Sequence, residues 1–209
     1  MNHMKAVIIG AGIGGLATAI RLRLKGYEVE VLEANASSGG KLAEFILEGG
    51  YRFDAGPSLF TLPEQMEDLF ALAGRKIEDY FRYSQLDVIC KYFYEDGTQI
   101  NAFNSPEKFA KEIETQTGEP AKNVRKALKK SGKMYDITHH VFLERSLHKA
   151  STYLRSGTLL SMAQLPAIDP FRTMAKANES LFEDPRVVQL FNRYATYNGS
   201  DPYQAPATL

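Results

Sequence analysis

The stretch VIIGAGIGGLATAI, residues 7–20, places a glycine-rich turn between two apolar runs near the start of the chain. The run KAVII before the turn is short and partly β-branched, which is typical of a buried parallel strand. After the turn, Leu16, Ile20 and Leu24 repeat at helical spacing, and Gly26 stands where a helix ends. The run YEVEVLE then alternates polar and apolar residues as a second strand. This order predicts a βαβ unit.

The glycines of the turn have the spacing G-x-G-x-x-G, which is typical of dinucleotide-binding βαβ units. Gly10 permits the tight turn, Gly12 lets the backbone approach a pyrophosphate, and Gly15 lets the helix pack close to the strand. The amino end of the helix offers N–H groups and a positive dipole end to phosphate. The predicted phosphate contacts are Gly10, Gly12, Ile13, Gly14 and Gly15.

An acidic residue, Glu33, ends the second predicted strand. A carboxylate at this place accepts hydrogen bonds from the ribose hydroxyls of an adenosine, and it repels a 2′-phosphate, which argues against NADP. A purely structural glycine turn is the alternative. It is disfavoured because strand, helix and acidic residue all occur in the expected order.

The composition fits a globular protein with a core, since 44% of the 209 residues are hydrophobic and 24% are charged. The 25 basic residues balance the 25 acidic ones, so overall charge gives no argument for nucleic-acid binding. The single cysteine, Cys90, excludes an intrachain disulfide and favours a reducing compartment such as the cytoplasm. The amino end is interpreted as a mature terminus, and no apolar run reaches the roughly 18 residues that span a bilayer.

Two segments after Glu33 resemble a known family. The run from Glu33 to Gly40 and Lys41 resembles the second flavin contact of the amine-oxidase and phytoene-desaturase superfamily of FAD enzymes. The segment GYRFDAGPSLFTLPEQMEDLFALAG, residues 50–74, closely resembles the bacterial-type phytoene desaturases, which include carotenoid desaturases and isomerases. The resemblance implies FAD as the cofactor, with Gly40 and Lys41 at the pyrophosphate. It also implies flavin neighbours at Gly56, Pro57 and Ser58.

Lys41 departs from the family pattern, in which an arginine is common at this position. A lysine keeps the charge but lacks the planar fork that contacts phosphate in a bidentate way. We therefore expect FAD binding to persist and to be weaker than with arginine.

The resemblance also implies an activity, the FAD-dependent desaturation of an apolar polyene with phytoene as the leading candidate. A saturated carbon pair would lose a hydride to the flavin and a proton to a base or to solvent, while the protein orients the substrate. An isomerase, saturase or ketolase activity stays open, and no residue is assigned as catalytic. Two other hypotheses are a non-catalytic nucleotide-binding fragment or split subunit and a flavin amine oxidase-like enzyme.

The predicted fold class is α/β, with two domains. Residues 1–85 form a Rossmann-like FAD-binding βαβ domain, and residues 86–209 form a partial, mainly helical second domain on the substrate side. Asp96 and Gly97 separate two β-prone runs and predict a hairpin. Ser105 and Pro106 predict a helix start, and Thr61 with Glu64 predict a capping box for another helix that ends at Gly74.

The resembled family is considerably longer than this sequence and returns to the nucleotide domain with further strands. The chain is therefore interpreted as the N-terminal portion of such an enzyme. A C-terminal half, a partner chain or a homo-oligomer would complete it.

Three further features allow more than one interpretation. The basic run Lys122, Arg125, Lys126, Lys129, Lys130 and Lys133 is interpreted as a solvated helix face, with peripheral contact to anionic lipid head groups as the alternative. The stretch LLSMAQLPAI, residues 159–168, is too short to span a bilayer, and suits a membrane interface or an apolar cavity. His139, His140 and His148 are interpreted as structural or surface residues, and no metal site is expected.

Overall fold

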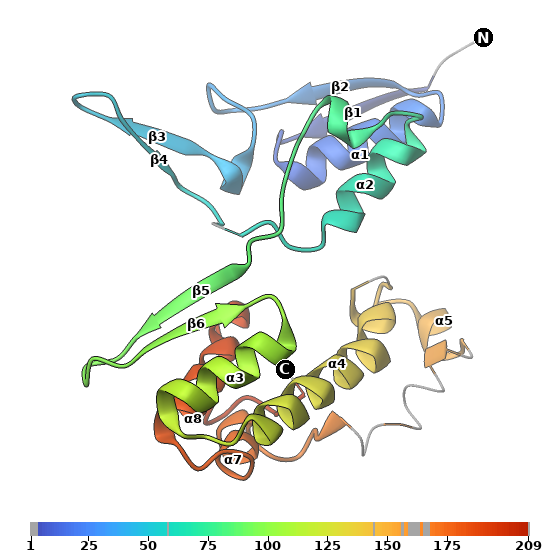
Figure 1. Ribbon diagram of the computed structural model, residues 1–209. Helices are drawn as coiled ribbons and strands as arrows, with labels where there is room; N and C mark the ends of the chain where they lie inside the picture. Colours follow the sequence, from blue (N-terminus) through green and yellow to red (C-terminus); the bar gives the residue numbers. More distant parts are fainter. Residues whose placement is uncertain are drawn as a thin grey trace. The chain divides into compact units, whose positions relative to one another are not determined.

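The computed structural model describes residues 4–57, 59–143, 145–155, 157–158, 164 and 168–208. Within it the chain divides into two compact units, Met1–Ser84 and Gln85–Leu209 (Figure 1). The prediction for Ser58 lies outside the described residues, as does that for residues 159–168 apart from positions 164 and 168. No helix of the described part is long and apolar enough to cross a bilayer.

The first unit opens with the predicted βαβ arrangement, which the structure confirms. Strand β1 (Lys5–Ile9) leads into helix α1 (Ile13–Leu24), and strand β2 (Glu28–Leu32) follows. The two strands pair in parallel, with Lys5 opposite Glu28 and Ile9 opposite Leu32. The helix ends before Gly26, whose φ of +86° is readily adopted by a residue without a side chain.

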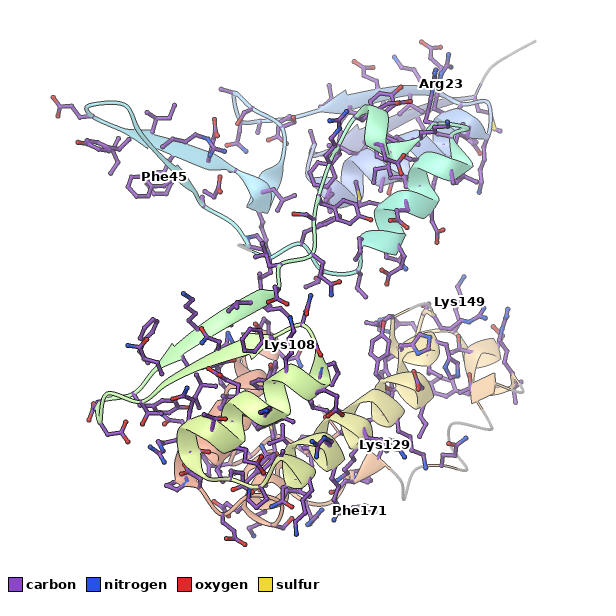
Figure 2. All side chains as sticks on the ribbon, viewed as in Figure 1. Arg23, Phe45, Lys108, Lys129, Lys149 and Phe171 are labelled. Carbon is purple, nitrogen blue, oxygen red and sulfur yellow. The ribbon has the colours of Figure 1, made fainter. Side chains whose placement is uncertain are left out.

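A hairpin that was not predicted from the sequence follows the βαβ unit. After the 3-10 turn η1 (Gly40–Leu42), strands β3 (Glu44–Leu47) and β4 (Tyr51–Asp54) pair antiparallel. Its turn contains Gly49 and Gly50, with φ of +88° and +83°. This glycine pair between two short β-prone runs is the sequence signal that could have predicted the hairpin. Phe45 is opposite Phe53 with the ring centroids 5.3 Å apart (Phe45 is labelled in Figure 2).

The unit closes with helix α2 (Pro63–Leu72) and the 3-10 turn η2 (Ile77–Asp79). The predicted capping box is wrong, because the helix begins at Pro63 and Leu62 is its N-cap, with φ 54° and ψ 53°. Proline disfavours the right-handed helical conformation in the residue before it, so Thr61 cannot cap a helix that starts after Leu62. The helix ends as predicted just before Gly74, which has φ +67°.

The second unit begins with the predicted hairpin. Strands β5 (Val88–Phe93) and β6 (Gln99–Phe103) are antiparallel, and the φ of Gly97 in their turn is +84°. Helix α3 (Pro106–Thr117) starts as predicted, since the Ser105 hydroxyl accepts a hydrogen bond from the Lys108 N–H. Helix α4 (Ala121–Phe142) packs beside α3 (Figure 1).

The described rest of this unit contains short helices. They are α5 (Ala150–Tyr153), α7 (Met174–Glu179), α8 (Pro185–Asn192) and the 3-10 segment η4 (Arg193–Asn198). The residues that fill the core come from the hairpin, α3, α4 and α8. They include Ile100, Phe109, Ile113, Val124, Val187 and Leu190, all at most 4% exposed.

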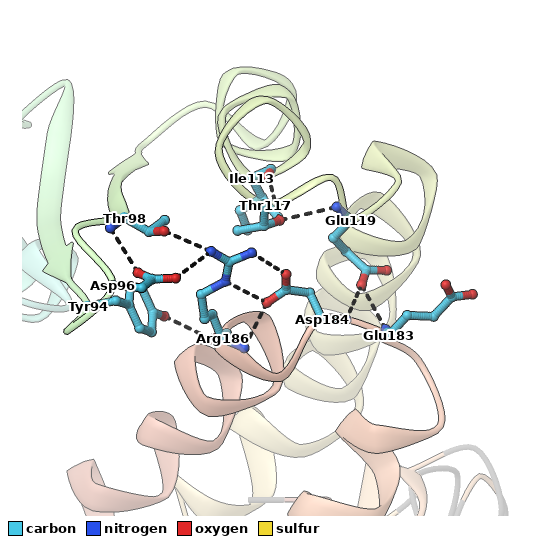
Figure 3. A network of polar contacts seen from close by, with 9 residues as sticks. All are labelled: Tyr94, Asp96, Thr98, Ile113, Thr117, Glu119, Glu183, Asp184 and Arg186. Carbon is cyan, nitrogen blue, oxygen red and sulfur yellow. Dashed lines mark hydrogen bonds and ion pairs between the residues drawn. The ribbon is translucent and has the colours of Figure 1, made fainter.

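A polar network ties α8 to the hairpin and to the α3–α4 connection (Figure 3). The Arg186 guanidinium donates to Asp96 at 2.8 Å, to Thr98 at 2.7 Å and to Asp184 at 2.6 Å. The carboxylate of Glu119, which is only 2% exposed, accepts hydrogen bonds from the N–H groups of Glu183 and Asp184. These donors belong to the amino end of α8, so Glu119 stabilises the start of that helix.

Candidate functional site

The fold alone requires glycine at two positions of the turn. Gly10 has φ +98°, a conformation that side chains disfavour. A Cβ atom on Gly15 would lie 2.0 Å from the Gly10 carbonyl oxygen. Helix α1 therefore approaches the turn too closely for any side chain at position 15, as the motif predicts.

Two other glycines in the turn are not required by the fold. Gly12 and Gly14 lack a positive φ, and a Cβ on Gly14 would meet no described atom within 4 Å. A Cβ on Gly12 would approach Gly40 only to 3.9 Å, which is ordinary contact. Their missing side chains leave the backbone at the start of α1 uncovered, where the motif predicts the close approach of a phosphate.

The amino end of α1 has the electrostatics of an anion site. Gly12 is the N-cap, and no side chain caps the helix among the described residues. The first helical hydrogen bond runs from the Leu16 N–H to the Gly12 carbonyl at 2.9 Å. The first turn has no acidic residue, so the positive end of the helix dipole is not neutralised there.

A second glycine segment contacts the first one directly. The Gly39 N–H donates to the Ala11 carbonyl at 2.9 Å, and Gly39 forms a parallel bridge with Gly12. Gly40 has φ +59°, and a Cβ there would lie 3.2 Å from the Gly12 Cα. The exposed side chain of Lys41 extends from η1, next to this contact. Predicted site residues from both segments thus lie together.

A third segment packs against the second. The Ala55 N–H donates to the Ala43 carbonyl at 2.8 Å. A Cβ on Gly56 would lie 2.1 Å from the Lys41 carbonyl oxygen, so only glycine fits there. Pro57 follows with an exposed side chain.

Glu33 is oriented by hydrogen bonds to its carboxylate. One oxygen accepts from the Ala11 N–H at 2.7 Å, and the other accepts from the Asn35 N–H at 2.9 Å and side-chain amide at 2.7 Å. These bonds, the Asn35 N–H first, hold the pKa of Glu33 below its usual value. Sequence reasoning missed Asn35, although an Asn two residues after an acid is a frequent turn signal.

The capacity of this carboxylate suits a ribose. An ionised carboxylate only accepts hydrogen bonds, and a ribose hydroxyl is a donor for such an acceptor. The group is fixed beside the glycine turn by its bond to Ala11.

Comparisons with known proteins show what the chain is similar to. Residues 8–75 match the family described as NAD(P)-binding Rossmann-like domain. A 1-hydroxycarotenoid 3,4-desaturase from a Flavobacterium species is 45% identical over 205 residues, which are 98% of this chain and 41% of the relative. A 4,4′-diapolycopene oxygenase from a Methylomonas species is 31% identical over 100% of this chain and 41% of the relative. A hydroxyneurosporene desaturase from Cereibacter sphaeroides is 32% identical over 98% and 41%.

Among solved structures, a wild-type putrescine oxidase bound to putrescine superposes with a TM-score of 0.46 at 15% identity, over 99% of this chain and 40% of that chain. The chain spans about 41% of the length of the curated relatives it matches. As the resemblance predicted, this chain is a homologue of the N-terminal part of the carotenoid desaturases, and it begins with a Rossmann-like dinucleotide-binding domain.

Proposed function

We propose that the chain binds FAD at the three glycine segments and Glu33 and serves an FAD-dependent carotenoid desaturase. The observation that carries this proposal is the direct contact of Gly39 and Gly40 with Ala11 and Gly12, beside the Glu33 carboxylate. A plain structural turn needs neither the open space at Gly14 nor a second glycine segment on top of it.

Each part of the cofactor has a matching group in the chain. The N–H groups at the start of α1 suit the pyrophosphate, and Glu33 suits the adenosine ribose. Lys41 supplies a positive charge at the second segment, and Gly56 with Pro57 lies next to it on the expected flavin side. The dinucleotide-binding domain is shown by the family match, and FAD is the specific cofactor that we propose.

The substrate that we propose is a carotenoid. A bound flavin supplies a two-electron acceptor for the removal of hydrogen from two adjacent carbons. The resemblance implied phytoene, whereas the name of the relative with 45% identity favours a hydroxylated carotenoid. The chain contributes cofactor binding and substrate orientation, and no described residue is assigned as a catalytic acid or base.

The substitution Glu33→Gln tests the cofactor site. It removes the charge and one acceptor of the ribose contact, so the dissociation constant for FAD should rise about tenfold. Quenching of flavin fluorescence on titration with the protein measures the constant, and Glu28→Gln on β2 is the matched control. An unchanged constant for the Glu33 variant would disprove the ribose assignment.

We also propose that helix α4 makes peripheral contact with anionic lipid. Lys122, Lys126, Lys129 and Lys133 follow one another at i, i+4, i+7 and i+11, so they form one stripe, and all four are exposed (Lys129 is labelled in Figure 2). Elsewhere in the run, Arg125 pairs with Glu107 and Lys130 with Asp169. No ion pair in the described part of the chain uses the four stripe lysines.

The carboxyl end of the same helix adds apolar surface. Phe142 and Leu143 are 61% and 60% exposed. A basic stripe beside exposed apolar side chains is the combination that binds membrane interfaces.

A further inference from the structure

A cavity of about 320 Å³ lies in the second unit, between the β5–β6 hairpin, α3, α4 and η4. Its walls are mainly apolar and include Ile89, Phe103, Phe109 and Leu128. Pockets for small molecules start at about 300 Å³ and combine apolar walls with a few polar groups. The cavity therefore has the size for one end of a long hydrocarbon.

The polar groups that line this cavity include Asn104 and three tyrosines, Tyr92, Tyr194 and Tyr197. The guanidinium of Arg193 lies over all three rings, at 5.3 Å from Tyr92, 5.9 Å from Tyr194 and 5.3 Å from Tyr197. It also donates a hydrogen bond to the Tyr197 hydroxyl at 3.2 Å. The cation and the aromatic rings thus stabilise one another.

The Tyr197 hydroxyl keeps its own proton for a ligand. Its oxygen accepts from Arg193, and a phenol whose oxygen accepts from a cation is a stronger donor through its own O–H. Burial raises the pKa of Tyr92 and of Tyr194, so both of these phenols stay neutral. These two tyrosines therefore add no negative charge to the cavity.

We propose that this cavity binds the hydroxylated end of an isoprenoid chain, with the alcohol at the Tyr197 hydroxyl and the methyl groups against the apolar walls. The inference rests on the proposed carotenoid function and deepens it, because it names the end group that the second unit recognises. A neutral alcohol fits better than an anion, since Arg193, the cation at these tyrosines, already contacts three rings and a phenol.

The single cysteine of the chain provides a reporter inside the cavity. Cys90 is a free thiol and lines the cavity wall. Its rate of reaction with an aromatic disulfide reagent should fall when a ligand fills the cavity. The probes are 2,6-dimethyloctan-2-ol, which carries the tertiary alcohol on an isoprenoid skeleton, and the alkane 2,6-dimethyloctane.

The expected result is that both probes protect Cys90 in the full chain. In Tyr197→Phe, which keeps the ring and removes the hydroxyl, the alcohol concentration for half protection should rise about fivefold. The value for the alkane should not change. Tyr203→Phe, at a 67% exposed tyrosine outside this cavity, is the matched control and should behave as the unmodified chain.

Two results would overturn the inference. Equal protection by the alcohol in Tyr197→Phe and in the unmodified chain would show that the Tyr197 hydroxyl does not bind the alcohol. Absence of protection by both probes would show that the cavity does not bind an isoprenoid chain. FAD affinity measured on the same samples separates the two proposals, because the flavin site and the cavity use different residues.

Discussion

At the scale of single residues, the glycines of the turn serve different purposes and should respond differently to substitution. Gly15→Ala places a Cβ 2.0 Å from the Gly10 carbonyl oxygen, so the helix or the turn must shift. We expect a loss of about 1–3 kcal/mol in the free energy of unfolding of the first unit, as for other overpacked sites. Urea unfolding followed by circular dichroism measures it.

Gly14→Ala is the matched substitution with the opposite expectation. No described atom lies within 4 Å of a Cβ at this position, and alanine favours a helix by about 1 kcal/mol over glycine. Stability should stay equal or rise, while FAD affinity should fall because the methyl group occupies the proposed phosphate space. A stable variant with unchanged FAD affinity would argue against that space as the phosphate site.

Lys41 offers a gain-of-function prediction at the same scale. Lys41→Arg restores a planar fork that can make two parallel hydrogen bonds to phosphate, so FAD should bind several-fold more tightly. Lys25→Arg, at the carboxyl end of α1, is the control with the same chemical change away from the segment. Weaker or equal FAD binding in the Lys41 variant would place its side chain away from the phosphates.

At the scale of elements, the buried Glu119 carboxylate fastens the start of α8. Glu119→Ala leaves the N–H groups of Glu183 and Asp184 without their acceptor. A loss of about 1–3 kcal/mol in unfolding free energy is expected for such buried donors. Glu107→Ala breaks the exposed ion pair with Arg125 and should cost at most about 1 kcal/mol, so comparable losses in both variants would contradict the account.

The same network predicts how stability depends on pH. The Arg186 guanidinium holds the pKa of Asp184 below its usual value, and hydrogen bonds from Thr98 lower that of Asp96. A lowered folded-state pKa contributes stability above the unfolded value of about 4, and that contribution is lost as pH falls through the folded value. Unfolding midpoints measured from pH 7 to pH 2 should therefore fall steeply below about pH 4. Asp184→Asn should flatten this fall, and an equally steep fall in that variant would contradict the assignment.

The lysine stripe of helix α4 gives a prediction about binding to anionic lipid. The double substitution of Lys126 and Lys129 by Glu should weaken binding to phosphatidylcholine vesicles containing phosphatidylglycerol by tenfold or more, at about 1 kcal/mol for each lysine. Co-sedimentation with vesicles measures it, and the double substitution of Lys91 and Lys111 by Glu is the control. Equal binding to purely zwitterionic vesicles would show that the stripe has no electrostatic role.

Local signals in the sequence predicted those elements whose ends carry characteristic turn or capping residues. The βαβ unit follows from its glycines and periodicity, and the β5–β6 hairpin follows from Asp96 and Gly97. The capping box failed because Pro63 sets the helix start, and the β3–β4 hairpin was missed because its residues were interpreted only as a family motif. Propensity over a few residues does not decide between such options.

At the scale of the whole molecule, the contacts that build the candidate site join segments that are distant in sequence. Gly12 meets Gly39, and Gly56 meets the Lys41 backbone, which no periodicity within either segment predicts. The family resemblance placed these residues at one cofactor, and the structure brings the described ones together. The contact between Tyr92 and Arg193 could not be predicted from the sequence either, because 101 positions separate the two residues.

The proposed sites lie in different units of the chain. The proposed flavin site lies in Met1–Ser84, whereas the proposed isoprenoid cavity and the basic stripe lie in Gln85–Leu209. The chain matches about 41% of the length of the carotenoid desaturases. The proposed flavin binding of this chain is therefore the property that would connect the structure most directly to that chemistry.

The most direct measurement is the visible absorption spectrum of the purified chain after incubation with FAD and desalting. The account predicts that the folded chain keeps the flavin absorption, and that Glu33→Gln keeps much less of it. A colourless chain that circular dichroism shows to be folded would contradict the claim that these glycine segments and Glu33 hold FAD.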